Sequence, residues 1–182
     1  MPRFLIFVVT LFFTIGGMMN AGQVNAQADK ENLLHIDLKD GRVVVELLPE
    51  KAPQHVERIK KLAREKFYDG IIFHRVIDGF MAQTGDPTGT GLGGSDYPDV
   101  PLEISDASFT RGAVGMARSA APNSANSQFF IMFEDAPHLN GNYTVWGRVI
   151  EGMDYVDAIT RGEPPAAPDK MLRVRVASDT GE

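Results

Sequence analysis

The stretch FHRVIDGFMAQTGD, residues 73–86, decides how the rest of this chain is interpreted. Its first five residues are interpreted as a β-strand with alternating faces, which places Phe73, Arg75 and Ile77 on one face and His74 and Val76 on the other. The dipeptide at 78–79, Asp-Gly, is a strong signal for a tight turn between two strands. A second short run follows it, so the stretch predicts a β-hairpin.

This hairpin would bring a cation, two large apolar side chains and an amide to one end of a sheet: Arg75, Phe80, Met81 and Gln83. Burying an arginine among apolar side chains is costly unless a partner compensates its charge. Two interpretations of Arg75 are therefore open. The side chain lies at the rim of a sheet with its guanidinium in water, or it belongs to a binding site.

Residues 1–28 differ in composition from everything that follows. Arg3 is their only charge, and residues 4–15 (FLIFVVTLFFTI) form an apolar core. Small residues then recur at 24–26 (VNA) and 26–28 (AQA), two alternative cleavage sites. This pattern predicts a secretory signal peptide at 1–28 and one domain at 29–182, located in a periplasm or outside the cell. The alternative is an uncleaved membrane anchor, because apolar character continues to about residue 22.

Charge and cysteine usage exclude several classes of function. Without its leader the chain carries 17 Lys and Arg against 24 Asp and Glu, and no cysteine. An acidic domain without basic runs predicts no nucleic-acid partner and no membrane contact in the mature form. The absence of cysteine excludes disulfides and thiol chemistry, and it suits an oxidising compartment.

The remaining periodicity predicts an all-β domain with two helices. An amphipathic helix within 51–67 places apolar residues at helical spacing, with His55 on its polar face, and a short second helix begins near Gly152. With the hairpin, the strands number roughly eight, which predicts a closed antiparallel β-barrel capped by the helices. The further strands are expected at 33–40, 43–48, 112–117, 127–133, 144–150 and 171–177.

Two motifs are false leads for a cofactor. Residues 89–94 (GTGLGG) match G-x-G-x-x-G, but Pro98 and Pro101 forbid the helix that a dinucleotide site requires, so residues 85–95 are expected to be a loop. The four histidines lack the spacing of metal ligands. We therefore expect neither a cofactor nor a metal.

Four segments in order resemble the cyclophilin family of peptidyl-prolyl cis–trans isomerases: FHRVIDGFMAQTGD, GAVGMA, PNSANSQFFIMF and HLNGNYTVWGRV. The resemblance covers about residues 32–177, and with a signal peptide the chain is most similar to bacterial periplasmic members. It implies an eight-stranded barrel with two helices, and isomerase activity on X–Pro bonds of exported proteins. It also implies proline-containing, unfolded or flexible polypeptides as partners.

The resemblance also assigns residues. It implies Arg75 as the catalytic arginine, with Phe80 and Gln83 as further catalytic residues. Substrate-binding positions that match the family's motifs are Met81, Ala117, Arg118, Gln128, Phe130, His138, Leu139 and Tyr143.

Three positions depart from the family's pattern. His138 stands where cyclosporin-sensitive members carry tryptophan, Tyr143 replaces a frequent pocket histidine, and Arg118 replaces an asparagine common in eukaryotic members. We therefore expect weak cyclosporin binding. We also expect a monomer.

Two functional classes remain open. The first is an isomerase that needs no covalent intermediate, because rotation about an X–Pro bond only requires the loss of amide resonance. The second is a chaperone module that binds proline peptides with little turnover.

Overall fold

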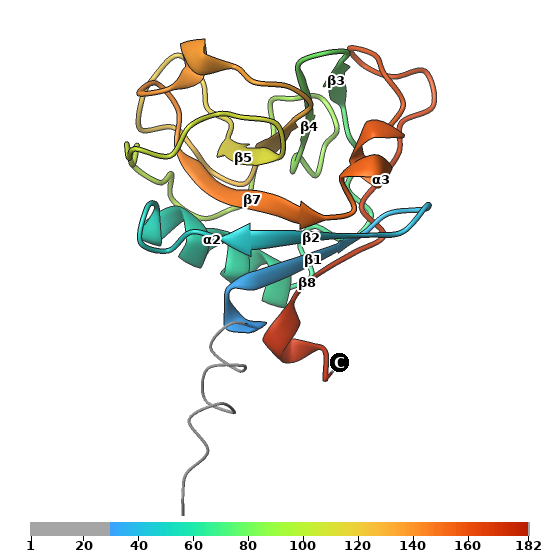
Figure 1. The fold of residues 1–182 in the computed structure, drawn as a ribbon, viewed down its shortest axis with the longest axis horizontal. Coiled ribbons are helices and arrows are strands. Elements are labelled where there is room, and N and C mark those ends of the chain that lie inside the picture. Colours follow the sequence, from blue (N-terminus) through green and yellow to red (C-terminus); the bar gives the residue numbers. More distant parts are fainter. Residues whose placement is uncertain (1–29, 182) are drawn as a thin grey trace, which may run out of the picture.

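Eight antiparallel strands form one sheet that curls strongly on itself (Figure 1). The computed structural model describes residues 30–181, so the signal peptide expected at 1–28 lies outside the described residues. The order of strands across the sheet is β3-β4-β6-β5-β7-β2-β1-β8. Their bounds are β1 Leu33–Asp37, β2 Arg42–Leu47, β3 Arg75–Ile77, β4 Met81–Thr84, β5 Ala113–Met116, β6 Phe129–Met132, β7 Val145–Glu151 and β8 Arg173–Val176.

The expected closed barrel is wrong, because the sheet is an open, strongly curled half-barrel. No ladder joins the end strands β3 and β8 among the described residues. Near that gap the segments that precede them meet at an isolated bridge, Ile72 to Lys170, and through a hydrogen bond from Gly70 N–H to the carbonyl of Met171. The segment that precedes β8 contains Pro164, Pro165 and Pro168, and proline cannot donate to a ladder.

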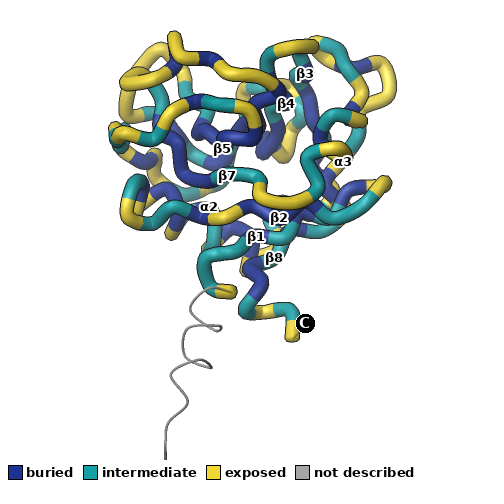
Figure 2. The backbone as a smooth tube through the Cα atoms, in the orientation of Figure 1, coloured by how far each residue is buried: buried dark blue, intermediate teal, exposed yellow. Residues whose placement is uncertain are grey.

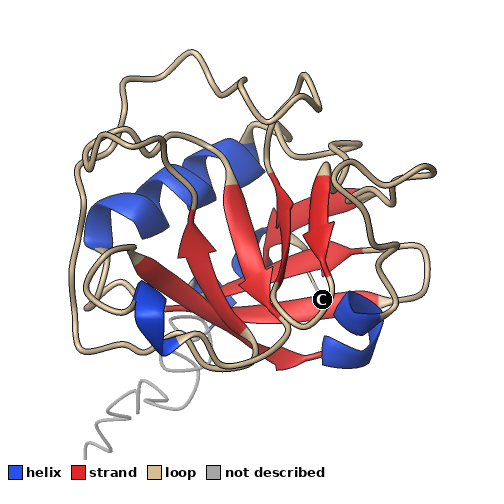
Figure 3. Ribbon diagram, turned by 90° about the horizontal axis from the view of Figure 1, so that it is seen from above, coloured by secondary structure: helices blue, strands red, loops and turns tan. Residues whose placement is uncertain are grey.

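Helix α2, Pro53–Arg64, packs against one end of the curled sheet, as the view from above shows (Figure 3). Pro53 begins the helix, where its missing N–H costs nothing. Val56, Ile59 and Leu62 follow at helical spacing and are buried against the sheet. The short helix α3, Met153–Asp157, follows β7. No helix among residues 30–181 is both long and apolar enough to span a membrane.

His55 does not lie on the polar face of α2, as the helical pattern suggested, but is fully buried. Glu103, from the long loop before β5, covers the start of the helix. Its carboxylate accepts from the backbone N–H groups of Gln54 and His55, and lies 2.6 Å from His55 Nδ1. Burial lowers the pKa of His55 although Glu103 opposes the shift. A loop distant in sequence therefore buries a position that is polar by pattern alone.

The two faces of strand β6 belong to different groups of buried residues. Phe129 and Ile131 belong to the inner core, the large cluster that lies inside the curl and includes α2. Phe130 and Met132 belong to a smaller outer cluster. Buried backbone follows the central strands in Figure 2, while the surrounding loops are more exposed. The members of the outer cluster are Met81, Phe109, Ala113, Phe130, Met132, Ala136, Leu139 and Val145.

Phe73 does not share a face with Arg75, contrary to the alternation in the sequence. Strand β3 begins only at Arg75, and Phe73 is buried in the inner core with Val76. Arg75 is partly exposed on the opposite side. The arginine is therefore not buried beside a phenylalanine of its own strand.

Candidate active site

The hairpin of β3 and β4 makes Arg75 and Gln83 direct cross-strand partners. Its turn depends on Gly79, whose φ of 64° lies in the left-handed region that glycine adopts without strain. Arg75, Met81 and Gln83 then line one pocket of about 270 Å³. The hairpin and the grouping of its side chains are confirmed.

The floor of this pocket is apolar. Met81, Phe130 and Leu139 line it, and little of each side chain is exposed. Behind it, the ring of Phe109 stacks on Phe130 with centroids 5.6 Å apart. Gly115 pairs with Phe130 across the strands, and a β-carbon at Gly115 would collide with both rings. A glycine opposite Phe130 therefore leaves the space that these two rings fill.

Aromatic and cationic side chains form the rim. The imidazole of His138 stacks on Phe80, with ring centroids 5.9 Å apart. The guanidinium of Arg118 lies 4.5 Å from the centroid of the Tyr143 ring and donates to the carbonyl of Asn142 at 2.8 Å. Arg118 thereby fixes two loops against each other beside the pocket.

Two glutamines connect the pocket to the glycine-rich loop. Gln83 Nε2 donates to Gln128 Oε1 at 2.9 Å. Gln128 Nε2 donates in turn to the carbonyls of Gly91 and Gly93, at 3.0 and 2.8 Å. One of the two N–H donors of the Gln83 amide is therefore used, whereas its carbonyl oxygen has no hydrogen-bond partner among the described residues.

Asp86 organises the glycine-rich loop, residues 85–95, which is a loop as expected. Its buried carboxylate accepts hydrogen bonds from Thr88 and from the backbone N–H groups of Gly91 and Gly93. Burial by itself would raise the pKa of Asp86, but these donors outweigh it and hold the pKa at about 2. The loop that presents two carbonyls to Gln128 is therefore built around one charged side chain.

Arg75 has a partner that is distant in sequence. Its Nε donates to Glu163 Oε2 at 2.7 Å, and both side chains are about half exposed. No side-chain hydrogen bond joins Arg75 to Gln83 in the described part of the chain. The neighbouring His74 is buried, and burial lowers its pKa.

The structure brings the site residues expected from the sequence together. Gln128 and His138 lie just outside the pocket, one bonded to Gln83 and the other stacked on Phe80. The others line it directly: Arg75, Phe80, Met81, Gln83, Ala117, Arg118, Phe130, Leu139 and Tyr143.

Three residues that shape this site were not identified from the sequence: Phe109, Asp86 and Glu163. Asp86 ended the hairpin motif, and its place before a glycine-rich loop was a usable signal. Phe109 and Glu163 carried no such signal, because they lie in loops and meet the pocket residues only in the folded chain.

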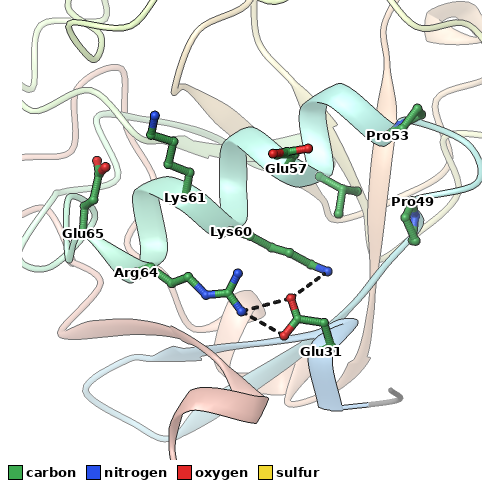
Figure 4. A pocket seen from close by; sticks show the side chains of 9 residues that line it. Glu31, Pro49, Pro53, Glu57, Lys60, Lys61, Arg64 and Glu65 are labelled. Carbon is green, nitrogen blue, oxygen red and sulfur yellow. Dashed lines mark hydrogen bonds and ion pairs between the residues drawn. The ribbon is translucent and has the colours of Figure 1, made fainter. Parts of the chain in front are cut away.

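Other depressions lie on the surface of residues 30–181. A shallow one of about 610 Å³ borders α2, where Glu31 is paired with Lys60 and Arg64 (Figure 4). A groove of about 430 Å³ adjoins the pocket and shares Gln83, Ala117 and Arg118 with it. Residues 30–181 contain no group of three or more His, Cys, Asp or Glu side chains that could hold a metal ion.

Comparisons with known proteins agree with this geometry. Residues 33–176 match the family profile described as cyclophilin type peptidyl-prolyl cis-trans isomerase/CLD. A probable peptidyl-prolyl cis-trans isomerase of Brucella suis is 52% identical over 178 residues, covering 89% of this chain and 91% of that protein. Peptidyl-prolyl cis-trans isomerase B of Bacillus subtilis is 44% identical over 141 residues, covering 76% and 94%.

Solved structures show the same fold. The crystal structure of a cyclophilin from Hirschia baltica superposes with a TM-score of 0.78 at 29% identity, covering 92% of this chain and 83% of that one. A cyclophilin-type isomerase of Cryptosporidium parvum, crystallised in the presence of the dipeptide Ala-Pro, gives 0.74 at 29% identity, covering 79% and 98%.

The chain belongs to the cyclophilin-type peptidyl-prolyl cis–trans isomerases. It is an enzyme of that activity.

Proposed function

We propose that this isomerase acts on X–Pro bonds of exported, unfolded or flexible proteins, and that Arg75 is its catalytic residue. The observation that carries the proposal is the pocket of about 270 Å³, in which Arg75 faces an apolar floor beside the amide of Gln83. No covalent intermediate or cofactor takes part. The Ala-Pro dipeptide used with the Cryptosporidium relative supports proline peptides as ligands of this chain.

The energetics require more than one residue. Rotation about an X–Pro bond has a barrier of about 18–20 kcal/mol and takes tens to hundreds of seconds. A rate of ~10³ per second would require lowering the barrier by about 7 kcal/mol. One charge-assisted hydrogen bond contributes about 1.5–3 kcal/mol. Positioning and exclusion of water must therefore supply the rest.

Each part of the pocket has a role in this mechanism. Met81, Phe130 and Leu139 hold the proline ring in a place that water does not enter. Phe80 covers that ring from the rim. The terminal nitrogens of Arg75 then donate to the carbonyl oxygen, or to the prolyl nitrogen that gains a lone pair when the bond is twisted.

The remaining side chains hold the flanking peptide. Gln83 offers its free carbonyl oxygen to the substrate backbone, since its amide nitrogen is bonded to Gln128. The other substrate-binding positions are Ala117, Arg118, Gln128, His138 and Tyr143.

Arg75→Ala tests the catalytic assignment. We expect kcat/KM for a short X–Pro peptide to fall about ten- to a few hundred-fold, with an unchanged circular dichroism spectrum and peptide affinity. Arg75→Lys is the matched control, because it keeps the charge but not the rigid fork of donors, and it should restore only part of the rate. Turnover close to that of the parent protein in Arg75→Ala would contradict the assignment.

The groove beside the pocket favours a second function, the capture of extended polypeptides as a chaperone. Since the groove shares three residues with the pocket, a client chain could extend from one into the other. Suppression of aggregation by the inactive but folded Arg75→Ala protein would support this role. Loss of that suppression together with turnover would argue against it.

Weak cyclosporin binding and a monomeric state are proposed with this function. His138 offers a smaller ring than tryptophan at the rim, and it is exposed there. We expect His138→Trp to raise cyclosporin affinity at least about tenfold, measured by inhibition of turnover, with turnover itself little changed. Sedimentation at micromolar concentration tests the monomer.

Export is proposed from the leader at 1–28. Expression of the full chain in a bacterium, followed by mass spectrometry of the periplasmic fraction, should give a mature protein that begins after Ala26 or Ala28. An intact chain found only in the membrane fraction would instead establish the anchor.

A further inference from the structure

Residues 161–163 run along the outer edge of β3, and their contribution to the site is so far only the contact of Glu163 with Arg75. Gly162 and Val76 exchange two backbone hydrogen bonds, each 2.8 Å long. The pairing is antiparallel, so Glu163 lies beside Arg75, and Arg161 lies beside the turn of the hairpin (Val76 to Gly162). Residues 161–163 thereby cover the free edge of β3 beside the side chain of Arg75.

This segment is held firmly in place. Arg161 Nη1 donates to the carbonyls of Asp157 and Ile159, at 2.7 and 2.6 Å, and its guanidinium lies 4.1 Å from the centroid of the Phe133 ring. Gly162 has a φ of 147°, and a side chain there would collide with the backbone of Pro165. Glu163 therefore follows Gly162, whose position is fixed by the contacts of Arg161 before it and by the packing against Pro165 after it.

Two ion pairs connect the segment to the hairpin. Arg161 Nε donates to Asp78 Oδ1 at 3.0 Å, and Arg75 Nε donates to Glu163 Oε2 at 2.7 Å. Glu163 is the only hydrogen-bond partner of the Arg75 guanidinium within residues 30–181. The bond uses Nε, so both terminal nitrogens remain available to a ligand in the pocket that Arg75 lines.

We propose that Glu163 is a positioning residue for the isomerase reaction, which acts by fixing the guanidinium of Arg75 toward the pocket. An arginine on the surface has many rotamers, and most of them would point its charge into water. A carboxylate bonded to Nε restricts those rotamers and leaves the two terminal nitrogens of the guanidinium free for the substrate. The inference rests on the proposed catalytic role of Arg75.

A purely structural role would have a different consequence. Exposed ion pairs contribute little to stability, because water and salt screen them. If Glu163 served only to attach its segment, its loss would resemble the loss of the neighbouring Asp78–Arg161 pair. Asp78 lies on the same edge but does not contact Arg75, so Asp78→Asn is a matched control.

The experiment uses the protein without its expected signal peptide, residues 29–182. It measures kcat and KM on a short X–Pro peptide, together with the melting temperature. The variants are Glu163→Gln, Glu163→Ala, Asp78→Asn, Arg75→Ala and the double variant Arg75→Ala with Glu163→Ala. We expect Glu163→Ala to lower kcat about three- to tenfold with little change in KM. Glu163→Gln should fall between it and the parent protein, because an amide oxygen still accepts from Nε. Asp78→Asn should retain the parent kcat.

The double variant gives the decisive measurement. If Glu163 acts through Arg75, its removal has no further effect once Arg75 is alanine. Equal losses in both backgrounds, or a parent kcat in Glu163→Ala, would overturn the inference. Full activity in Arg75→Ala would instead contradict the catalytic assignment of Arg75, so the two failures are distinguishable.

Discussion

The two faces of strand β6 make a direct comparison between stability and function. Phe129 and Phe130 are neighbours of the same type and both are buried. Phe129 meets Tyr68 and Trp146 edge-on in the inner core, at 5.5 and 5.4 Å between centroids. Phe130 instead lines the pocket, stacked on Phe109. Period-two alternation thus places one ring in the inner core and the next at the pocket.

The difference teaches that burial by itself does not identify a structural residue. The ring of Phe130 is as well covered as many core side chains, yet one of its sides faces a space that the chain does not fill. The first predictions therefore compare two variants in which Phe129 or Phe130 is replaced by alanine.

Phe129→Ala should have the largest effect on stability. We expect the free energy of unfolding to fall by about 3–5 kcal/mol, since a large cavity opens in the inner core. Phe130→Ala should lose about 1–3 kcal/mol, because its ring already borders open space. Urea unfolding of both proteins measures this order, and an equal loss would remove the distinction between the two faces.

Activity should show the reverse order. Per folded molecule, Phe130→Ala should lower kcat/KM about a hundredfold, because the proline ring loses its main contact, whereas Phe129→Ala should change it less than about threefold. Peptide isomerisation measured at a temperature where both proteins remain folded tests this.

Gly115→Ala tests whether the space beside the Phe130 ring is needed for the pocket. An added β-carbon would collide with Phe109 and Phe130, so both rings must move. We expect a stability loss of about 1–3 kcal/mol, together with a raised KM for the peptide. Gly70→Ala is a control for stability, because Gly70 has a φ of 85° but open space around it, and it should leave KM unchanged. An unchanged KM in Gly115→Ala would contradict the prediction.

Asp86→Asn tests the loop behind Gln128. The pKa of Asp86 in the folded protein is about 2, below its value in an unfolded chain. Its charge therefore stabilises the fold above about pH 4, and this contribution is lost as the pH falls through about 2. The variant should be about 1–2 kcal/mol less stable than the parent at pH 7, and the difference should shrink at pH 2. Unfolding at both pH values measures it, and a constant difference would assign the effect to something other than the charge.

His138→Ala should have the smallest effect. The stacking of His138 on Phe80 occurs at the exposed rim, so we expect a stability loss of about 0.5 kcal/mol and a less than about threefold change in kcat/KM. A larger loss of turnover would place His138 among the catalytic residues.

Much of the site was predictable because its residues are close in sequence to strong local signals. The turn at Asp78-Gly79 set the register that pairs Arg75 with Gln83, and alternation along β6 separated Phe130 from Phe129. Besides the closed barrel, two local predictions were wrong. Phe73 does not share a face with Arg75, because the strand begins later than the alternation, and His55 is buried by Glu103.

The sequence alone determined the strands and the amphipathic helix, because periodicity and turn chemistry are local properties. The resemblance of its ordered motifs to a known family, together with the hairpin, indicated the residues of the pocket. Only the tertiary structure showed that the sheet stays open, that Asp86 accepts hydrogen bonds from the glycine-rich loop, and that Glu163 pairs with Arg75. Those features depend on contacts between segments far apart in the chain, such as the 88 residues between Arg75 and Glu163. Local pattern carries no information on such pairs, since their geometry exists only after the chain has folded.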